Sequence, residues 1–147
     1  MIRYNLYSEN LKRISSSFTS IREVSSANDP DIEISINRFN SLYSWNEMFD
    51  LNDVMHRIDK GHRIFLFYFK NNVVGHCWIE HKPDYTYSYN IFIDKTVHDK
   101  SIVDSTVYFV MLSDKLFNEG VQSIQVDVDE WHKKSQDFCK RIGFYII

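Results

Sequence analysis

Three consecutive segments with the pattern of β-strands occupy the middle of the sequence. Residues 63–70 are almost wholly apolar or aromatic, which is typical of a strand buried on both faces. Asn71 and Asn72 predict a two-residue turn, and residues 73–80 return as the second arm of a hairpin. Residues 85–94 then alternate, with tyrosine or isoleucine at every second position. A hairpin followed by a third strand predicts a mainly antiparallel sheet.

Helical and strand patterns alternate after these strands. Residues 102–119 have apolar side chains at helical spacing and end at a glycine, which favours the left-handed conformation beyond a helix. Residues 123–129 alternate as a strand, and residues 131–142 predict a second helix that ends at Gly143. Residues 144–147 begin a last strand. This order predicts an α/β chain in which helices connect strands of one sheet.

The first third of the sequence has shorter patterns. Residues 2–6 alternate as a short strand, residues 9–24 have helical spacing, and residues 32–36 alternate as a further strand. Residues 44–60 predict one or two helices, with Gly61 in the left-handed position beyond the end.

Length and composition exclude several classes of protein. With 147 residues, 44% of them hydrophobic and 25% charged, the chain is expected to form one domain over residues 1–147. A net charge of −3 gives no basic field for nucleic acid, and no apolar run approaches the ~18 residues of a membrane span. The two cysteines lie far apart and the start lacks a signal-peptide pattern, so we expect reduced thiols and a cytoplasmic location. The six histidines lack the spacing of metal ligands, so no metal site is expected.

The end of the sequence carries the most specific motif. From His132 the chain reads HKKSQDFCKRIGF, which resembles the motif Asn-x-x-Ala-x-x-x-Tyr-x-x-x-Gly-Phe of the GNAT superfamily of N-acetyltransferases. His132, Ser135 and Cys139 stand at the Asn, Ala and Tyr positions, and the resemblance covers about residues 64–147. It implies an α/β (α+β) fold with a mixed, mostly antiparallel central sheet flanked by helices, here without the usual final strand.

The same resemblance implies a site for acetyl-CoA. In the family, the central strand is followed by a loop of the form Gln/Arg-x-x-Gly-x-Gly/Ala, whose backbone N–H groups and following helix N-terminus surround the coenzyme pyrophosphate. This chain has HDKSIV there, so five loop residues are expected to contact the coenzyme, namely His98, Lys100, Ser101, Ile102 and Val103. The branched side chain of Val103 stands at a glycine or alanine position and crowds the place of the phosphate.

The resemblance also implies where acyl transfer would take place. The backbone of Ile91, Phe92 and Ile93 would hold the pantetheine and supply the oxyanion donor, at the point where the two middle strands separate. Cys139 is the candidate acid for the leaving thiolate, and its alternative role is that of a buried apolar filler. His132 would orient the pantetheine or relay a proton, and its alternative role is that of a helix cap.

The base that deprotonates the acceptor ammonium has four candidates, which are Glu80, Tyr87, His76 and Asp127. The resemblance implies that the chain transfers an acetyl group from a coenzyme A thioester, acetyl-CoA, to an amine that the sequence does not identify. Two alternatives stay open. One is an inactive module of the same shape that serves in binding or assembly, and the other is a transferase of a longer acyl chain from a carrier protein.

The last strand, at residues 144–147, is short and apolar and would leave an open edge, which native proteins usually cover. We therefore expect residues 145–147 to pair with a strand from the first forty residues, for which residues 32–36 are a candidate. The alternative partner is a symmetry mate in a homodimer.

Overall fold

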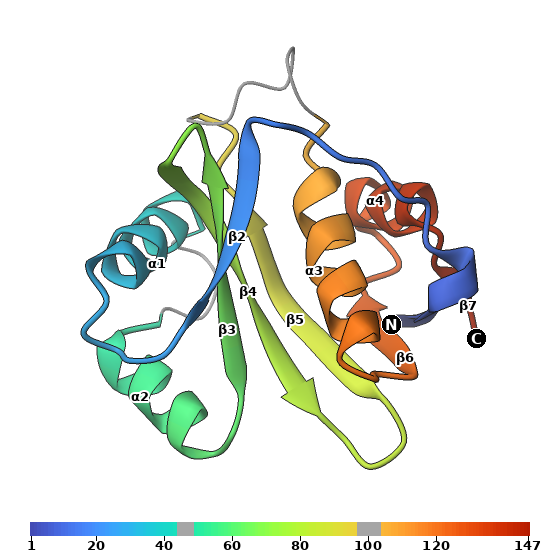
Figure 1. Ribbon diagram of the computed structural model, residues 1–147, viewed down its shortest axis with the longest axis horizontal. Helices are drawn as coiled ribbons and strands as arrows, with labels where there is room; N and C mark the ends of the chain where they lie inside the picture. Colours follow the sequence, from blue (N-terminus) through green and yellow to red (C-terminus); the bar gives the residue numbers. More distant parts are fainter. Residues whose placement is uncertain (44–48, 97–103) are drawn as a thin grey trace.

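A computed structural model describes residues 1–43, 49–96 and 104–147 of the chain (Figure 1). Within these ranges, seven strands form one sheet in the order β2-β3-β4-β5-β6-β1-β7. Neighbouring strands are antiparallel except for the parallel pair β5 and β6, which confirms the predicted mixed, mostly antiparallel sheet. The strands are β1 (Ile2–Tyr7), β2 (Thr19–Val24), β3 (Arg63–Phe69), β4 (Asn72–His81), β5 (Thr86–Ile93), β6 (Ser123–Val128) and β7 (Tyr145–Ile146).

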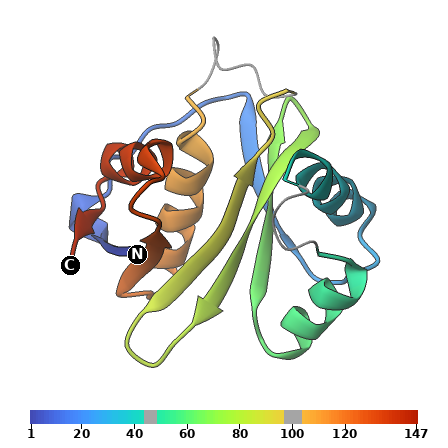
Figure 2. The same cartoon turned by 180° about the vertical axis from the view of Figure 1, so that it is seen from behind.

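Helices cover both faces of this sheet, and the hydrophobic cores beneath them differ in size. The helices α3 (Val107–Asn118) and α4 (Lys133–Ile142) lie on one face, and α1 (Pro30–Leu42) and α2 (Leu51–Asp59) lie on the other (Figures 1 and 2). The larger hydrophobic core lies under α3 and α4, and a smaller core around Trp78 lies under α1 and α2. We call the side of the sheet that faces α1 and α2 the second face, because it carries the polar groups described below.

The strand-rich middle of the chain has the structure that its pattern predicts. β3 pairs with β4, and β4 pairs with β5. The turn between β3 and β4 lies one residue earlier than predicted. Lys70 and Asn71 have positive φ angles of 48° and 67°, as the two central residues of a type I′ turn require, and Asn72 already pairs with Phe69.

The helix predicted over residues 9–24 is wrong. A 3-10 helix (Ser8–Asn10) is followed by irregular chain and then by β2, which pairs with β3 along its whole length. Among the apolar residues at helical spacing, Ile14 and Phe18 are 43% and 45% exposed and so do not form a buried stripe. Strand pairing with the central hairpin outweighs the local periodicity of this segment.

The strand predicted over residues 32–36 is also wrong, because this segment lies inside α1. Asp29 caps the helix with its side chain, and Pro30 occupies the first helical position. Ile32 and Ile36 are four residues apart and both buried, whereas the isoleucine between them is 41% exposed. The same isoleucines fit a period of two and a helical period, and the capping signal before them decides for the helix.

The remaining predicted helices are present within the described residues. α2 ends before Gly61, which has a φ of 86° as predicted, and α4 begins at Lys133. The described part of α3 begins at Val107 and not at Ile102, which lies outside the described residues together with residues 44–48.

The first strand of the chain covers the C-terminal strand. β1 lies between β6 and β7, and it pairs with β7 at Asn5↔Tyr145 and Tyr4↔Ile146. A partner from the first forty residues is therefore confirmed, although it is β1 and not residues 32–36. Gly143 permits this arrangement, because its φ of 119° ends α4 and a Cβ there would lie 2.0 Å from the carbonyl oxygen of Asn10.

Candidate functional site

β5 and β6 pair at one end and then separate. In the described part of the chain their ladder consists of Thr86↔Ile124 and Tyr87↔Gln125, whereas β5 continues to Ile93 and β6 to Val128. The edge of β5 beyond Tyr87 thus faces β6 without ladder pairing in the described residues. This edge includes the backbone of Ile91, Phe92 and Ile93, the residues predicted to hold the pantetheine.

A β-bulge in β5 lies at this separation. The register between β4 and β5 shifts between His76 and Trp78, and Asn90 on β5 has a φ of 52°. On the β4 side, a Cβ at Gly75 would lie 1.9 Å from the carbonyl oxygen of Phe92, so only glycine allows this close approach. The bulge therefore depends on two backbone positions with little tolerance for change.

A buried histidine connects this bulge to α1. His76 is fully buried, and burial lowers its pKa to about 4, so the ring is neutral. Its Nε2 lies 2.6 Å from Oδ1 of Asn90, and its Nδ1 lies 2.6 Å from the hydroxyl of Ser35. Because the amide oxygen only accepts, Nε2 carries the proton and Nδ1 accepts from Ser35. Both ring nitrogens of His76 are therefore engaged, one at the bulge and the other at α1.

The second face carries a chain of hydrogen bonds that begins at Tyr89 on β5. The Tyr89 hydroxyl lies 2.9 Å from Nδ1 of His62, and Nε2 of His62 lies 3.1 Å from a carboxylate oxygen of Glu80. Burial lowers the pKa of His62 although Glu80 opposes this shift, so a neutral ring accepts from Tyr89 and donates to Glu80. Lys82 forms an ion pair with the other oxygen of Glu80 and lowers the pKa of that carboxyl.

Arg57, from α2, lies beside the same tyrosine. Its guanidinium donates to the Tyr89 hydroxyl and lies 4.4 Å from the ring centre of Trp78 and 4.9 Å from that of Tyr89. The ring of Phe49 lies at 5.6 Å. Stacking on three aromatic rings holds a cation in a fixed orientation.

The predicted residue Tyr87 belongs to a different chain of hydrogen bonds on the same face. It lies directly opposite Glu80 in the β4–β5 ladder, but its hydroxyl donates to Asp127 on β6 at 3.1 Å. Asp127 also accepts two hydrogen bonds of 2.9 Å from Arg3. The structure thus brings Tyr87 and Asp127 together, and it places Glu80 with His62 and Tyr89.

Two predicted residues lie on α4. Cys139 is 3% exposed within the larger core, and burial raises the pKa of its thiol to about 12. His132 caps α4, because its Nδ1 accepts from the backbone N–H of Ser135 at 3.1 Å. The geometry therefore shows the filler and cap environments that we named as alternatives for these two residues.

The predicted coenzyme loop lies outside the described residues. This applies to His98, Lys100, Ser101, Ile102 and Val103. The described residue next to the loop, Asp104, accepts from the backbone N–H of Thr106 and pairs with Arg141 of α4 at 2.8 Å. Arg141 is thus a cation close to the start of α3 that could contact a phosphate group.

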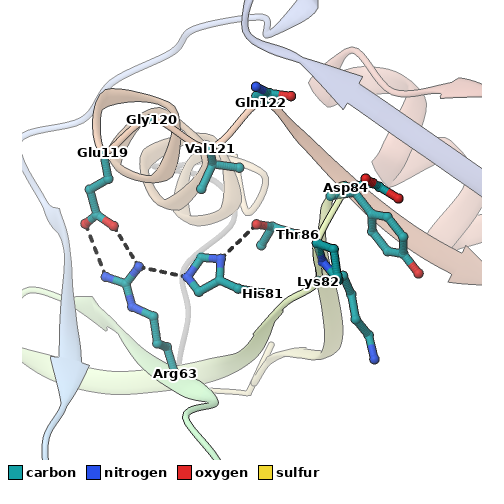
Figure 3. Close-up of a pocket in the computed structure, with 11 residues that line it drawn as sticks. Arg63, His81, Lys82, Asp84, Thr86, Glu119, Gly120, Val121 and Gln122 are labelled. Atoms are coloured by element: carbon teal, nitrogen blue, oxygen red, sulfur yellow. Dashed lines mark hydrogen bonds and ion pairs between the residues drawn. The ribbon is translucent and has the colours of Figure 1, made fainter.

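A polar hollow of about 400 Å³ lies at the opposite end of β5 (Figure 3). In this hollow Arg63 donates to Glu119 and Glu23, Lys82 pairs with Glu80, and His81 lies 2.9 Å from the hydroxyl of Thr86. Because its lining includes residues 81–86, at the start of β5, this hollow lies away from the end of the sheet where β5 and β6 diverge. Among residues 1–43, 49–96 and 104–147, no cluster of His, Cys, Asp or Glu is placed to hold a metal ion. No helix in those ranges is long and apolar enough to cross a membrane.

The sequence matches the model of a known protein family. A model described as the acetyltransferase (GNAT) family matches residues 26–144. A search of curated proteins finds no significant match.

Solved structures share the fold at low sequence identity. A protein of unknown function from Staphylococcus epidermidis has a TM-score of 0.70 and 15% identity over 99% of this chain, which spans 57% of that protein. An aminoglycoside acetyltransferase from an uncultured soil metagenomic sample, in complex with sisomicin, has a TM-score of 0.65 and 16% identity, and the match covers 85% of this chain and 87% of that one. A predicted acetyltransferase from Clostridium acetobutylicum, solved with acetyl-CoA, has a TM-score of 0.57 and 13% identity over 86% of this chain and 90% of that one.

Proposed function

Because the chain belongs to the acetyltransferase (GNAT) family, we propose that it transfers an acetyl group from acetyl-CoA to an amine by direct attack. The observation that carries this proposal is the separation of β5 from β6 beyond Tyr87, next to the bulge at Asn90. The neighbour solved with acetyl-CoA supports the donor, and the aminoglycoside acetyltransferase supports an amine acceptor.

The edge of β5 beyond Tyr87 offers backbone hydrogen-bonding groups that a bound thioester can use. Bound acetyl-CoA would supply an activated acetyl group and a thiolate leaving group. The backbone of Ile91, Phe92 and Ile93 offers N–H and C=O groups that can pair with the pantetheine, and an N–H there stabilises the oxyanion. Backbone donors do not depend on side-chain identity, so they tolerate the divergence of this sequence from the family motif.

The acceptor ammonium must lose a proton before its nitrogen attacks. In our proposal, Tyr89 accepts this proton while its own hydroxyl proton passes to Nδ1 of His62, and the Nε2 proton of His62 passes to Glu80. The lowered pKa of His62 keeps the ring neutral and able to accept. Glu80 was predicted from the sequence as a catalytic residue, and here it acts through His62.

Protonation of the leaving thiolate is the role that the resemblance suggests for Cys139, and proton relay is one of the roles that it suggests for His132. The raised pKa of the buried Cys139 thiol makes proton transfer to a thiolate unfavourable. His132 holds a proton on Nε2 when Nδ1 accepts from Ser135, so it keeps a donor that could face a coenzyme. We therefore expect solvent or His132, and not Cys139, to supply this proton.

The decisive test is binding and turnover with acetyl-CoA. Calorimetry and thermal shift should detect binding, because a ligand of the native state raises the melting temperature by mass action. Thiol release with a panel of amines then measures transfer, with little background because Cys77 and Cys139 are buried. No heat and no thermal shift at millimolar acetyl-CoA would contradict the proposal and favour a binding module. Binding of a longer acyl-CoA alone would favour the carrier-dependent transferase.

A further inference from the structure

We propose that the amine acceptor carries an oxyanionic group, a carboxylate or a phosphate, and that Arg57 binds this group on the second face of the sheet. This inference rests on the proposed acetyl transfer, and it names the class of acceptor. It follows from how charges are paired around β5.

The carboxylates near Tyr87 and Tyr89 on the second face already have basic partners. Glu80 pairs with Lys82 and accepts from His62. Asp127 is held by both arms of the Arg3 guanidinium. Neither carboxylate is therefore free to bind the extra positive charges of a polycationic acceptor.

Arg57 is the contrasting case. No carboxylate among the described residues lies within ion-pair distance of its guanidinium. A guanidinium has five N–H donors, and the described residues accept from Arg57 at the Tyr89 hydroxyl alone. Its aromatic neighbours hold the planar fork in place but accept no further conventional hydrogen bond. A planar fork with spare donors is the group that binds a carboxylate or phosphate through two bonds.

The electrostatic surroundings have the sign that this ligand requires. His62, in the middle of the cluster, experiences the positive charges of Arg57, Lys60 and Lys82 against the single negative charge of Glu80. The charges that act on this ring are therefore mostly positive, which favours a negatively charged group on the acceptor.

A second donor without a partner lies against the same guanidinium. Nε1 of Trp78 is buried and has no hydrogen-bond partner among the described residues. The ring that carries this N–H is the one on which Arg57 stacks most closely, at 4.4 Å. Buried donors are normally satisfied, so two neighbouring donor groups with spare capacity point to an acceptor-rich ligand. An oxyanion supplies such acceptors.

The reaction itself is unchanged by this assignment. The amine nitrogen forms a bond to the acetyl carbon, the carbon–sulfur bond breaks, and the ammonium proton leaves through Tyr89. The oxyanion of the acceptor stays at Arg57 and takes no part in the bond changes. Arg57 is therefore a specificity-determining residue that acts on substrate binding.

The test compares matched acceptors with and without the anion. The panel runs from glycine to 6-aminohexanoate, each beside the alkylamine of the same chain length, with O-phosphoethanolamine as the phosphate arm. We expect at least one anionic amine to exceed its neutral counterpart by about 100-fold in kcat/KM. Arg57→Gln should lower kcat/KM for that anionic acceptor about 100-fold more than for the neutral alkylamine of the same length, because any loss that acts through the hydrogen bond to Tyr89 lowers both alike. The loss in Arg57→Lys should lie between that of the native chain and that of Arg57→Gln, because lysine keeps the positive charge but lacks the planar fork of N–H donors.

The matched control is Arg22→Gln. Arg22 also stacks on a tyrosine, 5.7 Å from the ring of Tyr68, and donates to its hydroxyl, but it is already paired with Asp29. This variant should leave the preference for anionic acceptors within about twofold of the native value. If Arg57→Gln affects anionic and neutral amines equally, or if a polycationic amine is the best acceptor, the inference is overturned.

A binding experiment separates this inference from the proposed function. The preferred anionic amine is titrated calorimetrically into the native chain and into Arg57→Gln, each saturated with coenzyme A, which permits no turnover. Binding that is lost in Arg57→Gln supports the anion site even if no amine is ever acetylated. Acetylation of amines without any preference for an anion supports the proposed function and overturns the inference.

Discussion

Tyr87 and Tyr89 are adjacent on one face of β5, and their rings stack at a centroid distance of 5.8 Å, yet their hydroxyls have opposite surroundings. Tyr87 donates to Asp127, a carboxylate whose pKa is lowered by its hydrogen bonds with Arg3. Tyr89 accepts from Arg57 and donates to the neutral ring of His62. The Tyr87 hydroxyl therefore bonds to a carboxylate that is paired with Arg3, whereas the Tyr89 hydroxyl bonds to a histidine ring that can take up a proton.

This difference determines which of the two tyrosines can pass a proton to its partner. Burial and the charge of Asp127 raise the pKa of Tyr87 to about 12, and its partner Asp127 is a weak base. Burial also raises the pKa of Tyr89, but Arg57 opposes this shift and His62 can accept the proton that Tyr89 releases. We therefore assign proton transfer to Tyr89 and a structural bridge between β5 and β6 to Tyr87.

The largest expected effect tests the different roles of Tyr89 and Tyr87 directly. Tyr89→Phe keeps the ring packing but removes the hydroxyl, and it should lower kcat by about 100-fold, which is at the lower end for general acid–base catalysis. Tyr87→Phe is the matched control and should lower kcat by less than about fivefold. Both are measured by thiol release at saturating acetyl-CoA. A larger loss in Tyr87→Phe than in Tyr89→Phe would reverse the assignment.

The second prediction concerns pH. A protonated His62 cannot accept from Tyr89, so kcat/KM should fall about tenfold per pH unit below the pKa of His62, which lies below 6.5. Glu80 raises this pKa, so Glu80→Gln should move the acidic limb to lower pH as well as lowering the rate. A role of Glu80 in folding alone would leave the position of the limb unchanged. The profile is measured between about pH 4.5 and 8, with circular dichroism as the check on folding.

The third prediction concerns Cys139, which resembles Tyr87 in that burial raises its pKa to about 12. A thiol that holds its proton so firmly is a poor acid, so Cys139→Ala should keep kcat within about threefold. The same change leaves a small void in the larger core and should lower the free energy of unfolding by about 1–2 kcal/mol. Steady-state kinetics and urea unfolding measure the two quantities separately. A loss of kcat much larger than the change in coenzyme affinity would restore Cys139 as the acid.

Most of the second half of the fold was predictable from the sequence. The hairpin 63–80, the strand 85–94 and the helix ending at Gly143 combine long periodic patterns with matching turn residues. The predictions for the segments 9–24 and 32–36 were wrong, because the local patterns there are ambiguous. Their apolar residues fit more than one period, and distant β pairing decided the first while a short capping signal decided the second.

The candidate site was predictable only in part. Glu80 and Tyr87 were found because alternation places them on one face of their strands. The partners Arg57 and His62 were missed, because α2 and the turn after it bring them to Tyr89 of β5 from 32 and 27 residues away in sequence. Tyr89 was visible in the alternation, but its partners were not. A histidine directly after the glycine that ends a helix, at the start of a buried strand, was the available signal.

The smallest expected effect tests the ion pair beneath Tyr87. Arg3 is partly exposed, so removing it in Arg3→Gln should lower the free energy of unfolding at pH 7 by about 1 kcal/mol or less. The pKa of Asp127 is lowered in the folded chain, so this contribution is present above its unfolded pKa near 3.8 and is lost as pH falls through the folded value. Native and variant chains should thus differ slightly at pH 7 and converge in acid, as measured by urea unfolding. Their kcat/KM should agree within about threefold, because Asp127 accepts no proton during the reaction. A loss of activity in Arg3→Gln comparable to that in Tyr89→Phe would instead place the base on the β6 side of β5, where Tyr87 and Asp127 meet.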